Sequence, residues 1–227
     1  MNAFTHAVEV GTHAIETDIR LSRDGVIVLS HVDNNADNII AALTRVFLSV
    51  PSPYRPWRDR VVLGSWTAEY LSLVRDHFPV YPLAITTFSI QYARQFLTVP
   101  GVSISINQKV LMGCGGRRFL ADAKRAGKAV FVWTVNKEVL MRWSVRRKVD
   151  GVITDQPVLF EDVVRQWEDD DYGDGFVSNE VEITLEQRAM ALLATIASWV
   201  LGIVLTVMYP VKFRRLDGTV DDGLGYA

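Results

Sequence analysis

The sequence of 227 residues contains one cysteine and four histidines, which limits the chemistry open to it. A lone thiol, Cys114, cannot form an internal disulfide, and this fits a reducing compartment. Lysine and arginine total 24 against 26 aspartate and glutamate residues, for a formal net charge of −2. That balance gives no support to a nucleic-acid partner, which would favour a basic surface. The first ten residues show no signal-peptide pattern.

Charge is also absent from residues 189–211, a long apolar run. About 20 such residues are needed to cross the hydrocarbon core of a bilayer. Tyr209 near one end, and Lys212, Arg214 and Arg215 just beyond it, suit a membrane interface. The sequence therefore predicts a transmembrane helix over 189–211, with a buried core helix as the alternative. A span so near the C-terminus indicates a single-pass tail anchor that leaves the preceding domain in the cytosol.

The most informative chemical pattern is a pair of carboxylates, Glu16 and Asp18, followed by a hairpin signal and a histidine. Side chains two apart on a strand point to the same face. Two adjacent carboxylates repel unless a cation lies between them, and a hard divalent cation is the usual solution. Asp24-Gly25 predicts a tight turn into a second strand. That strand delivers His31 at its end, where a proton-transfer group could act.

Strand and helix patterns alternate along residues 1–167, the predicted domain. Strands are expected over 14–19, 61–64, 83–87, 102–106, 129–133 and 151–154. Helices are expected over 1–11, 36–49, 68–77, 90–97, 117–126, 137–146 and 158–167. This alternation predicts an α/β fold with a parallel sheet and right-handed crossovers.

Three further segments lie outside this alternation. Residues 168–188 are acidic and contain glycine, so an extended linker is expected. Residues 212–227 form a short polar tail. The glycine-rich stretch 113–118 is similar to a phosphate-binding loop at a helix start, and a flexible connection is the alternative.

Three motifs in the same order resemble those of the glycerophosphodiester phosphodiesterase family. They are the Glu16 to His31 stretch, the segment 131–136 (FVWTVN) and the segment 150–157 (DGVITDQP). The resemblance covers roughly residues 1–165. Residues 63–67 and 92–97, together with the hydrophobic C-terminus, are similar to fungal, membrane-attached members that act as phosphatidylglycerol phospholipase C.

The resemblance implies a TIM-type (β/α) barrel that hydrolyses glycerophosphodiesters or glycerophospholipids with Mg²⁺ or Ca²⁺. Glu16 and Asp18 would be metal ligands, and His31 would be one of two proton-transferring histidines. Trp133 and Asn136 follow a strand at the functional rim of such barrels and would line the substrate site. Packing in the core is the alternative for Trp133. The partners implied are a phospholipid or glycerophosphodiester substrate and the membrane.

The barrel is expected to be incomplete. A barrel of this type has eight strands, and six are expected here. The family's first strand, with its His-Arg pair, and its third strand, with a further acidic ligand and a lysine, have no counterpart. The alternative function is therefore a catalytically inactive, membrane-tethered remnant, or the product of a truncated gene model, with at most a lipid-headgroup binding role.

Overall fold

The computed structural model of the chain describes residues 2–17, 19–21, 27–29, 36–50, 55–171 and 185–208. Its centre is a five-stranded parallel sheet in which sequence neighbours are also spatial neighbours. The strands are β3 (Leu63–Ser65), β4 (Leu83–Thr87), β5 (Val102–Asn107), β6 (Val130–Trp133) and β7 (Gly151–Val152). The predicted α/β class and parallel sheet are confirmed.

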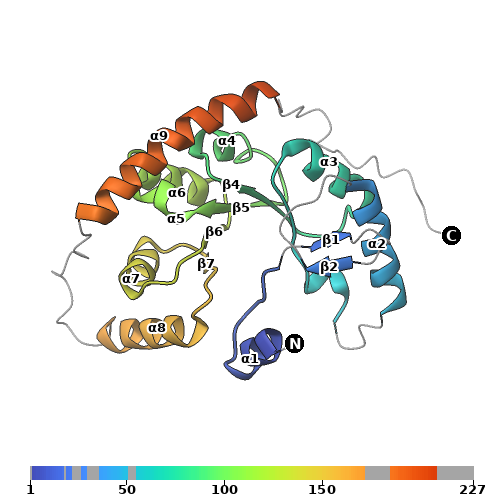
Figure 1. Ribbon diagram of the computed structural model, residues 1–227, viewed down its shortest axis with the longest axis horizontal. Coiled ribbons are helices and arrows are strands. Elements are labelled where there is room, and N and C mark those ends of the chain that lie inside the picture. Colours follow the sequence, from blue (N-terminus) through green and yellow to red (C-terminus); the bar gives the residue numbers. More distant parts are fainter. Residues whose placement is uncertain are drawn as a thin grey trace.

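Helices connect the strands and cover the sheet (Figure 1). The connecting helices are α3 (Ala68–His77), α4 (Ile90–Arg94), α5 (Gln108–Met112), α6 (Gly116–Arg125) and α7 (Glu138–Arg147). α1 (Asn2–Glu9), α2 (Ala36–Ser49) and the 3-10 turn η1 (Trp57–Asp59) precede the sheet, and α8 (Pro157–Asp171) follows it. α2 and α3 have the predicted bounds, whereas α5 was not expected, since five residues are too few for an apolar periodicity to emerge.

The core lies between the sheet and its helices. β4 and β5 carry buried side chains on both faces, as parallel strands covered by helices do. Tyr92 and Phe96 from the α4 segment, Phe119 from α6 and Met141 from α7 are fully buried against them. The helix-bearing half of the chain, from β3 to α8, therefore forms one continuous hydrophobic core.

The first predicted strand is wrong in its bounds, and it lies outside the parallel sheet. Residues 14–17 have no regular structure, and β1 (Ile19–Leu21) pairs antiparallel with β2 (Ile27–Leu29), with Ile19 opposite Leu29. The hairpin is thus confirmed, but it forms a separate two-stranded sheet. Within the described residues, β2 is the strand that pairs with β1, and neither strand joins the five-stranded sheet.

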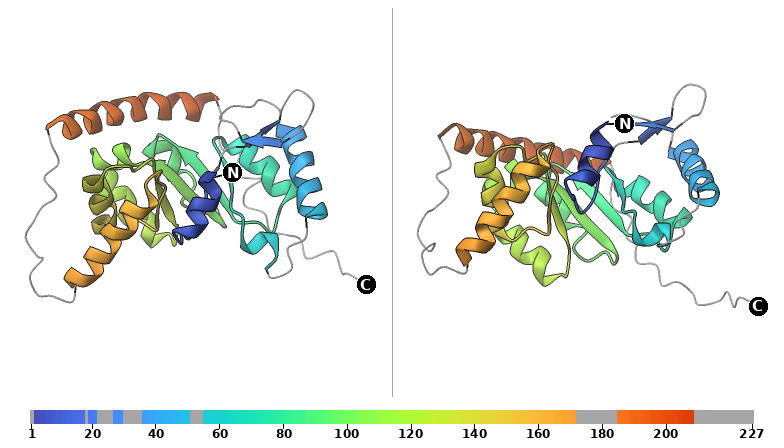
Figure 2. Two further views of the ribbon diagram at one scale, coloured as in Figure 1. Left: turned by 60° about the horizontal axis from the view of Figure 1, so that its bottom comes forward. Right: turned by 90° about the horizontal axis from the view of Figure 1, so that it is seen from below.

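The sheet is open in the part of the chain that the structure describes, with β3 and β7 at its edges. Figure 2 shows the hairpin and α2 on the α3 side of the molecule, and α7 and α8 on the other side. This arrangement is a barrel wall of five strands and agrees with the predicted loss of the first and third strands.

The helix α9 (Leu185–Met208) lies along α4 and α5 (Figure 1). Ser198 is buried, and its hydroxyl oxygen accepts a hydrogen bond from the backbone N–H of Ile90 at 3.3 Å. Gly202 approaches so closely that a Cβ there would lie 2.5 Å from the Ser89 hydroxyl oxygen. Small residues on one face of α9 therefore hold it against the domain.

The transmembrane prediction over 189–211 is not upheld. Within the described residues, no helix is long and apolar enough to cross a membrane. α9 covers most of that range and packs one of its faces against α4 and α5. Of the predicted linker 168–188, residues 168–171 belong to α8 and residues 185–188 to α9, and the rest lies outside the described residues. The predicted tail, 212–227, lies outside the described residues.

Candidate functional site

Short turns follow the strands β3, β4 and β5 and start the next helix at once. The side chains of Thr67, Ser89 and Asn107 each accept a hydrogen bond from a backbone N–H in the first turn of α3, α4 and α5, at 3.3, 3.3 and 3.2 Å. These are N-caps, which satisfy N–H groups that a helix start leaves unpaired. Because the caps follow the strands so closely, the adjoining residues are held at the C-terminal rim of the sheet.

Three aromatic side chains meet at this rim. Trp66 follows β3, Phe88 follows β4 and Trp133 ends β6. The ring centroids of Phe88 and Trp133 lie 4.7 Å apart in an edge-to-face arrangement, and Trp66 lies 5.5 Å from Phe88 and 5.6 Å from Trp133. Trp66 and Phe88 remain 42% and 41% exposed. These three residues, called the rim cluster below, form an aromatic surface open to solvent.

The indole N–H of Trp133 is a buried donor with no hydrogen-bond acceptor among the residues that the structure describes. A buried polar group without a partner costs about 1–3 kcal/mol and is uncommon in folded proteins. Trp133 thus packs in the rim cluster at the end of β6, and it also carries a donor that a ligand oxygen could satisfy. Its role as a substrate-lining residue remains a prediction that fits this placement.

Asn136 is engaged in holding two loops together. Its Nδ2 donates to the Asp155 carboxylate at 2.6 Å, and its Oδ1 accepts from the Asp155 backbone N–H at 2.9 Å and the Thr154 hydroxyl at 3.1 Å. The amide of Asn136 therefore joins the loop after β6 to the loop after β7. Because both loops lie at the C-terminal rim, Asn136 can shape a substrate site there through these bonds.

Of the three residues predicted to bind metal or transfer a proton, the structure describes one, Glu16. Asp18 and His31 lie outside the described residues, and Glu16 is exposed in the irregular segment before β1. In the described part of the chain, no group of three or more histidine, cysteine, aspartate or glutamate side chains could hold a metal ion. One exposed carboxylate does not make a metal site, so the metal remains a prediction from the sequence.

The glycine-rich stretch serves a tight turn between α5 and α6. Gly115 has a φ of +90°, a conformation that glycine adopts without cost. A Cβ at Gly116 would lie 1.8 Å from the Leu111 carbonyl oxygen, so only glycine fits there. Arg117 and Arg118 are exposed. The geometry of the turn explains why both positions are glycine. This favours a connecting role for the stretch over a phosphate-binding role.

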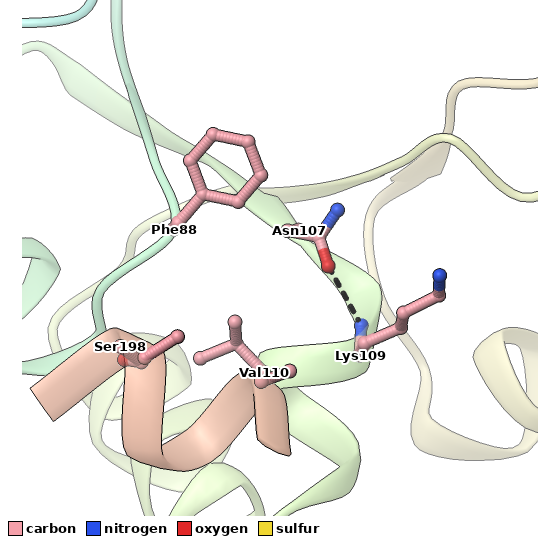
Figure 3. A pocket seen from close by; sticks show the side chains of 7 residues that line it. Phe88, Asn107, Lys109, Val110 and Ser198 are labelled. Atoms are coloured by element: carbon pink, nitrogen blue, oxygen red, sulfur yellow. Dashed lines mark hydrogen bonds between the residues drawn. The ribbon is translucent and has the colours of Figure 1, made fainter. Parts of the chain in front are cut away.

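A cavity of about 350 Å³ lies beside the rim cluster, between the sheet rim and α9 (Figure 3). It is lined by Phe88, Asn107, Val110, Ala194, Ala197 and Ser198, with Lys109 at one end. This cavity could not be predicted from the sequence, because α9 was expected to leave the domain and enter a membrane. Trp66 and Phe88 could have been found as the residues directly before the helix caps Thr67 and Ser89.

The groups with shifted pKa values lie away from the rim. Arg94 and Arg125 both donate hydrogen bonds to the Asp122 carboxylate. These bonds lower the pKa of that carboxyl, and Arg94 has the larger effect. Burial, and then the charge of Arg75, lowers the pKa of Lys128, whose ammonium donates to the Val99 carbonyl before β5. Such groups at the N-terminal side of the strands act on stability, as expected for that face of a barrel.

Comparison with known proteins identifies the family to which the chain is similar. The model of the glycerophosphoryl diester phosphodiesterase family matches residues 1–46 and 31–159. Residues 31–46 belong to both matches, so the family pattern is interrupted there, close to the point where a block was predicted to be missing. None of the curated protein sequences matches the chain significantly.

Solved structures agree on the fold. A phosphodiesterase of Oleispira antarctica, in complex with the product sn-glycerol-3-phosphate, matches with a TM-score of 0.60 at 16% identity, over 70% of this chain and 88% of that one. A putative glycerophosphoryl diester phosphodiesterase of Silicibacter pomeroyi gives 0.56 at 15%, over 74% and 88%. The glycerophosphodiester phosphodiesterase of Thermotoga maritima gives 0.51 at 21%, over 71% and 90%.

Proposed function

Because the chain belongs to the glycerophosphoryl diester phosphodiesterase family, we propose that it hydrolyses glycerophosphodiesters or glycerophospholipids at the C-terminal rim of its parallel sheet. The observation that carries this proposal is the rim cluster of Trp66, Phe88 and Trp133. Active sites of (β/α) barrels are built at this end of the strands. An exposed aromatic surface there is suited to the glycerol and apolar parts of such a substrate.

Trp133 would bind the substrate through its indole N–H. This buried donor has no acceptor within the described residues, and a phosphate or hydroxyl oxygen would satisfy it. The ring itself is held by edge-to-face contacts with both Trp66 and Phe88. Its orientation is therefore set before the substrate arrives, which lowers the entropic cost of binding.

The reacting groups in this proposal are Glu16, Asp18 and His31. Glu16 and Asp18 would bind Mg²⁺ or Ca²⁺, which when bound neutralises charge on a phosphodiester. His31 would transfer a proton to or from a substrate oxygen, a role that typically contributes about 10²–10⁴-fold in rate. The hairpin pairing of β1 with β2 supports this grouping, because Ile19, which follows the carboxylate pair in the sequence, lies opposite Leu29, which shortly precedes His31 in the sequence.

A lipid substrate is supported by the outer face of α9. Its exposed side chains are almost all large and apolar: Met190, Leu192, Leu193, Ile196, Trp199, Val200, Ile203, Val204 and Val207. Apolar patches of this kind mark interaction sites. We propose that this face contacts a membrane surface on the cytosolic side, and the basic residues Lys212, Arg214 and Arg215 that follow in the sequence would favour anionic lipids.

The proposal is tested by hydrolysis of glycerophosphoglycerol by the purified full chain, with Mg²⁺, with Ca²⁺ and with EDTA. We expect glycerol phosphate release that EDTA abolishes. His31→Ala should lower the rate at least 100-fold, whereas His77→Ala, an exposed histidine on α3, should not. Absence of release with both cations would favour the inactive remnant.

A further inference from the structure

The cavity beneath α9 is a second binding feature of the rim. We infer that it binds one acyl chain of an anionic glycerolipid, so that the rim acts on acylated glycerophosphodiesters as well as deacylated ones. This inference rests on the proposed function of the same site. It adds a specific binding place for the acyl chain of the substrate. It also gives a reason for the packing of α9 beside the rim.

The lining of the cavity is suited to a hydrocarbon. Phe88 and Val110 lie on the sheet side, and Ala194 and Ala197 lie on α9. The polar atoms at its wall are already engaged: the Ser198 hydroxyl accepts from the Ile90 N–H, and the Asn107 amide donates to the Trp133 carbonyl and accepts from the Lys109 N–H. A ligand in this space therefore meets apolar surface and few unsatisfied polar groups.

The volume of the cavity is suited to one acyl chain. Its volume of about 350 Å³ is at the lower end of ligand pockets, which are roughly 300–1,000 Å³. Ala194 and Ala197 line it with small side chains, which leave this space unfilled. α9 cannot move in to close it, since Ser198 and Gly202 already touch the start of α4.

Charge at one end gives the ligand a direction. The side chain of Lys109 is exposed beside Asn107 at the end of the cavity (Figure 3). Across the described ranges, the Lys109 ammonium forms no ion pair and no hydrogen bond. An anionic phosphate next to an apolar chain would place its charge near this lysine and its chain between Phe88 and α9.

The cavity is continuous with the rim cluster through one residue. Phe88 lines the cavity and also contacts Trp133 and Trp66, at centroid distances of 4.7 and 5.5 Å. A glycerophosphodiester held at Trp133 is therefore next to the entrance of the cavity. A chain esterified to its glycerol has a short path past Phe88 into the apolar space.

Binding to the full chain tests the inference without requiring turnover. The probes are 1-dodecanoyl-lysophosphatidylglycerol, below its micelle concentration, and glycerophosphoglycerol, which has the same head without the chain. Ala197→Phe fills the cavity and should weaken binding of the lysolipid at least tenfold, while binding of glycerophosphoglycerol stays within twofold. Ala189→Phe, at an exposed position of α9 outside the cavity, should change neither. Unchanged lysolipid binding by Ala197→Phe, or an equal loss for both probes, would overturn the inference.

Lys109→Met provides a second test should Ala197→Phe not fold. Lys109→Met should weaken binding of the lysolipid about tenfold. Its affinity for neutral monododecanoylglycerol should stay within twofold of that of wild type. Equal affinities of wild type and Lys109→Met for the lysolipid would overturn the inference. The two proposals remain separable: binding that depends on Ala197 without hydrolysis of either probe refutes only the proposed function. Hydrolysis of glycerophosphoglycerol with lysolipid binding insensitive to Ala197 refutes only the acyl-chain site.

Discussion

The phenolic oxygen of Tyr92 accepts a hydrogen bond from the backbone N–H of Ala68 at 2.8 Å, in the fully buried interior. Tyr92 is in α4, which follows β4, and Ala68 is the first residue of α3, which follows β3. The bond therefore fixes the start of one helix to the next helix along the sheet. Trp66 and Phe88, which precede these two helices, owe part of their placement to it.

Removing that acceptor should destabilise the domain. Tyr92→Phe keeps the ring but leaves the Ala68 N–H buried without a partner, at a cost of about 1–3 kcal/mol. Urea unfolding of the full chain measures this difference. Tyr70→Phe, at a partly exposed tyrosine of α3, should cost less than about 0.5 kcal/mol. Equal stabilities of Tyr92→Phe and wild type would show that the bond has no structural role.

Alanine at Gly116 should be strongly destabilising. The new Cβ would be 1.8 Å from the Leu111 carbonyl oxygen, a backbone atom that cannot move without distorting α5. A loss of about 3 kcal/mol or more is expected, above the usual cost of overpacking. Thermal unfolding compares it with Gly64→Ala, where the nearest atom would be 3.8 Å away and the effect should be small. Similar melting temperatures for the two variants would contradict the close approach.

Acid should weaken the domain through Asp122. Arg94, and then Arg125, hold the pKa of this carboxyl below its ordinary value in the folded state. The unfolded chain lacks these bonds and takes up a proton at higher pH, near the ordinary value of about 3.9. The stabilisation is thus complete above about pH 4 and is lost as pH falls through the lowered folded pKa.

Urea midpoints of wild type and Asp122→Asn across pH 3 to 7 measure this contribution. Asp122→Asn should have a lower urea midpoint than wild type at pH 7. The difference between the two midpoints should become smaller as the pH approaches 3. Asp162→Asn, an exposed carboxyl on α8, is the matched control and should not show that narrowing. A gap that is constant with pH would contradict the role assigned to Arg94.

Much of the fold could be predicted because its signals are local. The helices over 36–49 and 68–77 were predicted to the residue, and the strand over 83–87 likewise. Apolar periodicity and capping residues such as Thr67 define these elements within a few positions. The first strand was expected over 14–19, whereas β1 begins at Ile19 and pairs with β2, a boundary that the apolar pattern around Glu16 does not define.

The site was only partly predictable. Trp133 was recognised from a motif, and the structure places it at the rim, whereas Phe88 and Lys109 carry no motif and matter only through their neighbours. α9 was predicted to leave the domain because its apolar run suggests a bilayer. The serine and glycine that fix it, Ser198 and Gly202, lie within that run and are inconspicuous without the partner helix.

The most direct measurement is a fluorescence titration of the full chain with sn-glycerol 3-phosphate, with Mg²⁺ or Ca²⁺ present. The chain has six tryptophans, so wild type is compared with Trp133→Phe and with Trp199→Phe on the exposed face of α9. If the rim cluster is the substrate site, wild type and Trp199→Phe show the same saturable change, and Trp133→Phe loses most of the signal and binds at least tenfold more weakly. Equal affinity and equal signal in Trp133→Phe would place the substrate elsewhere and contradict the account.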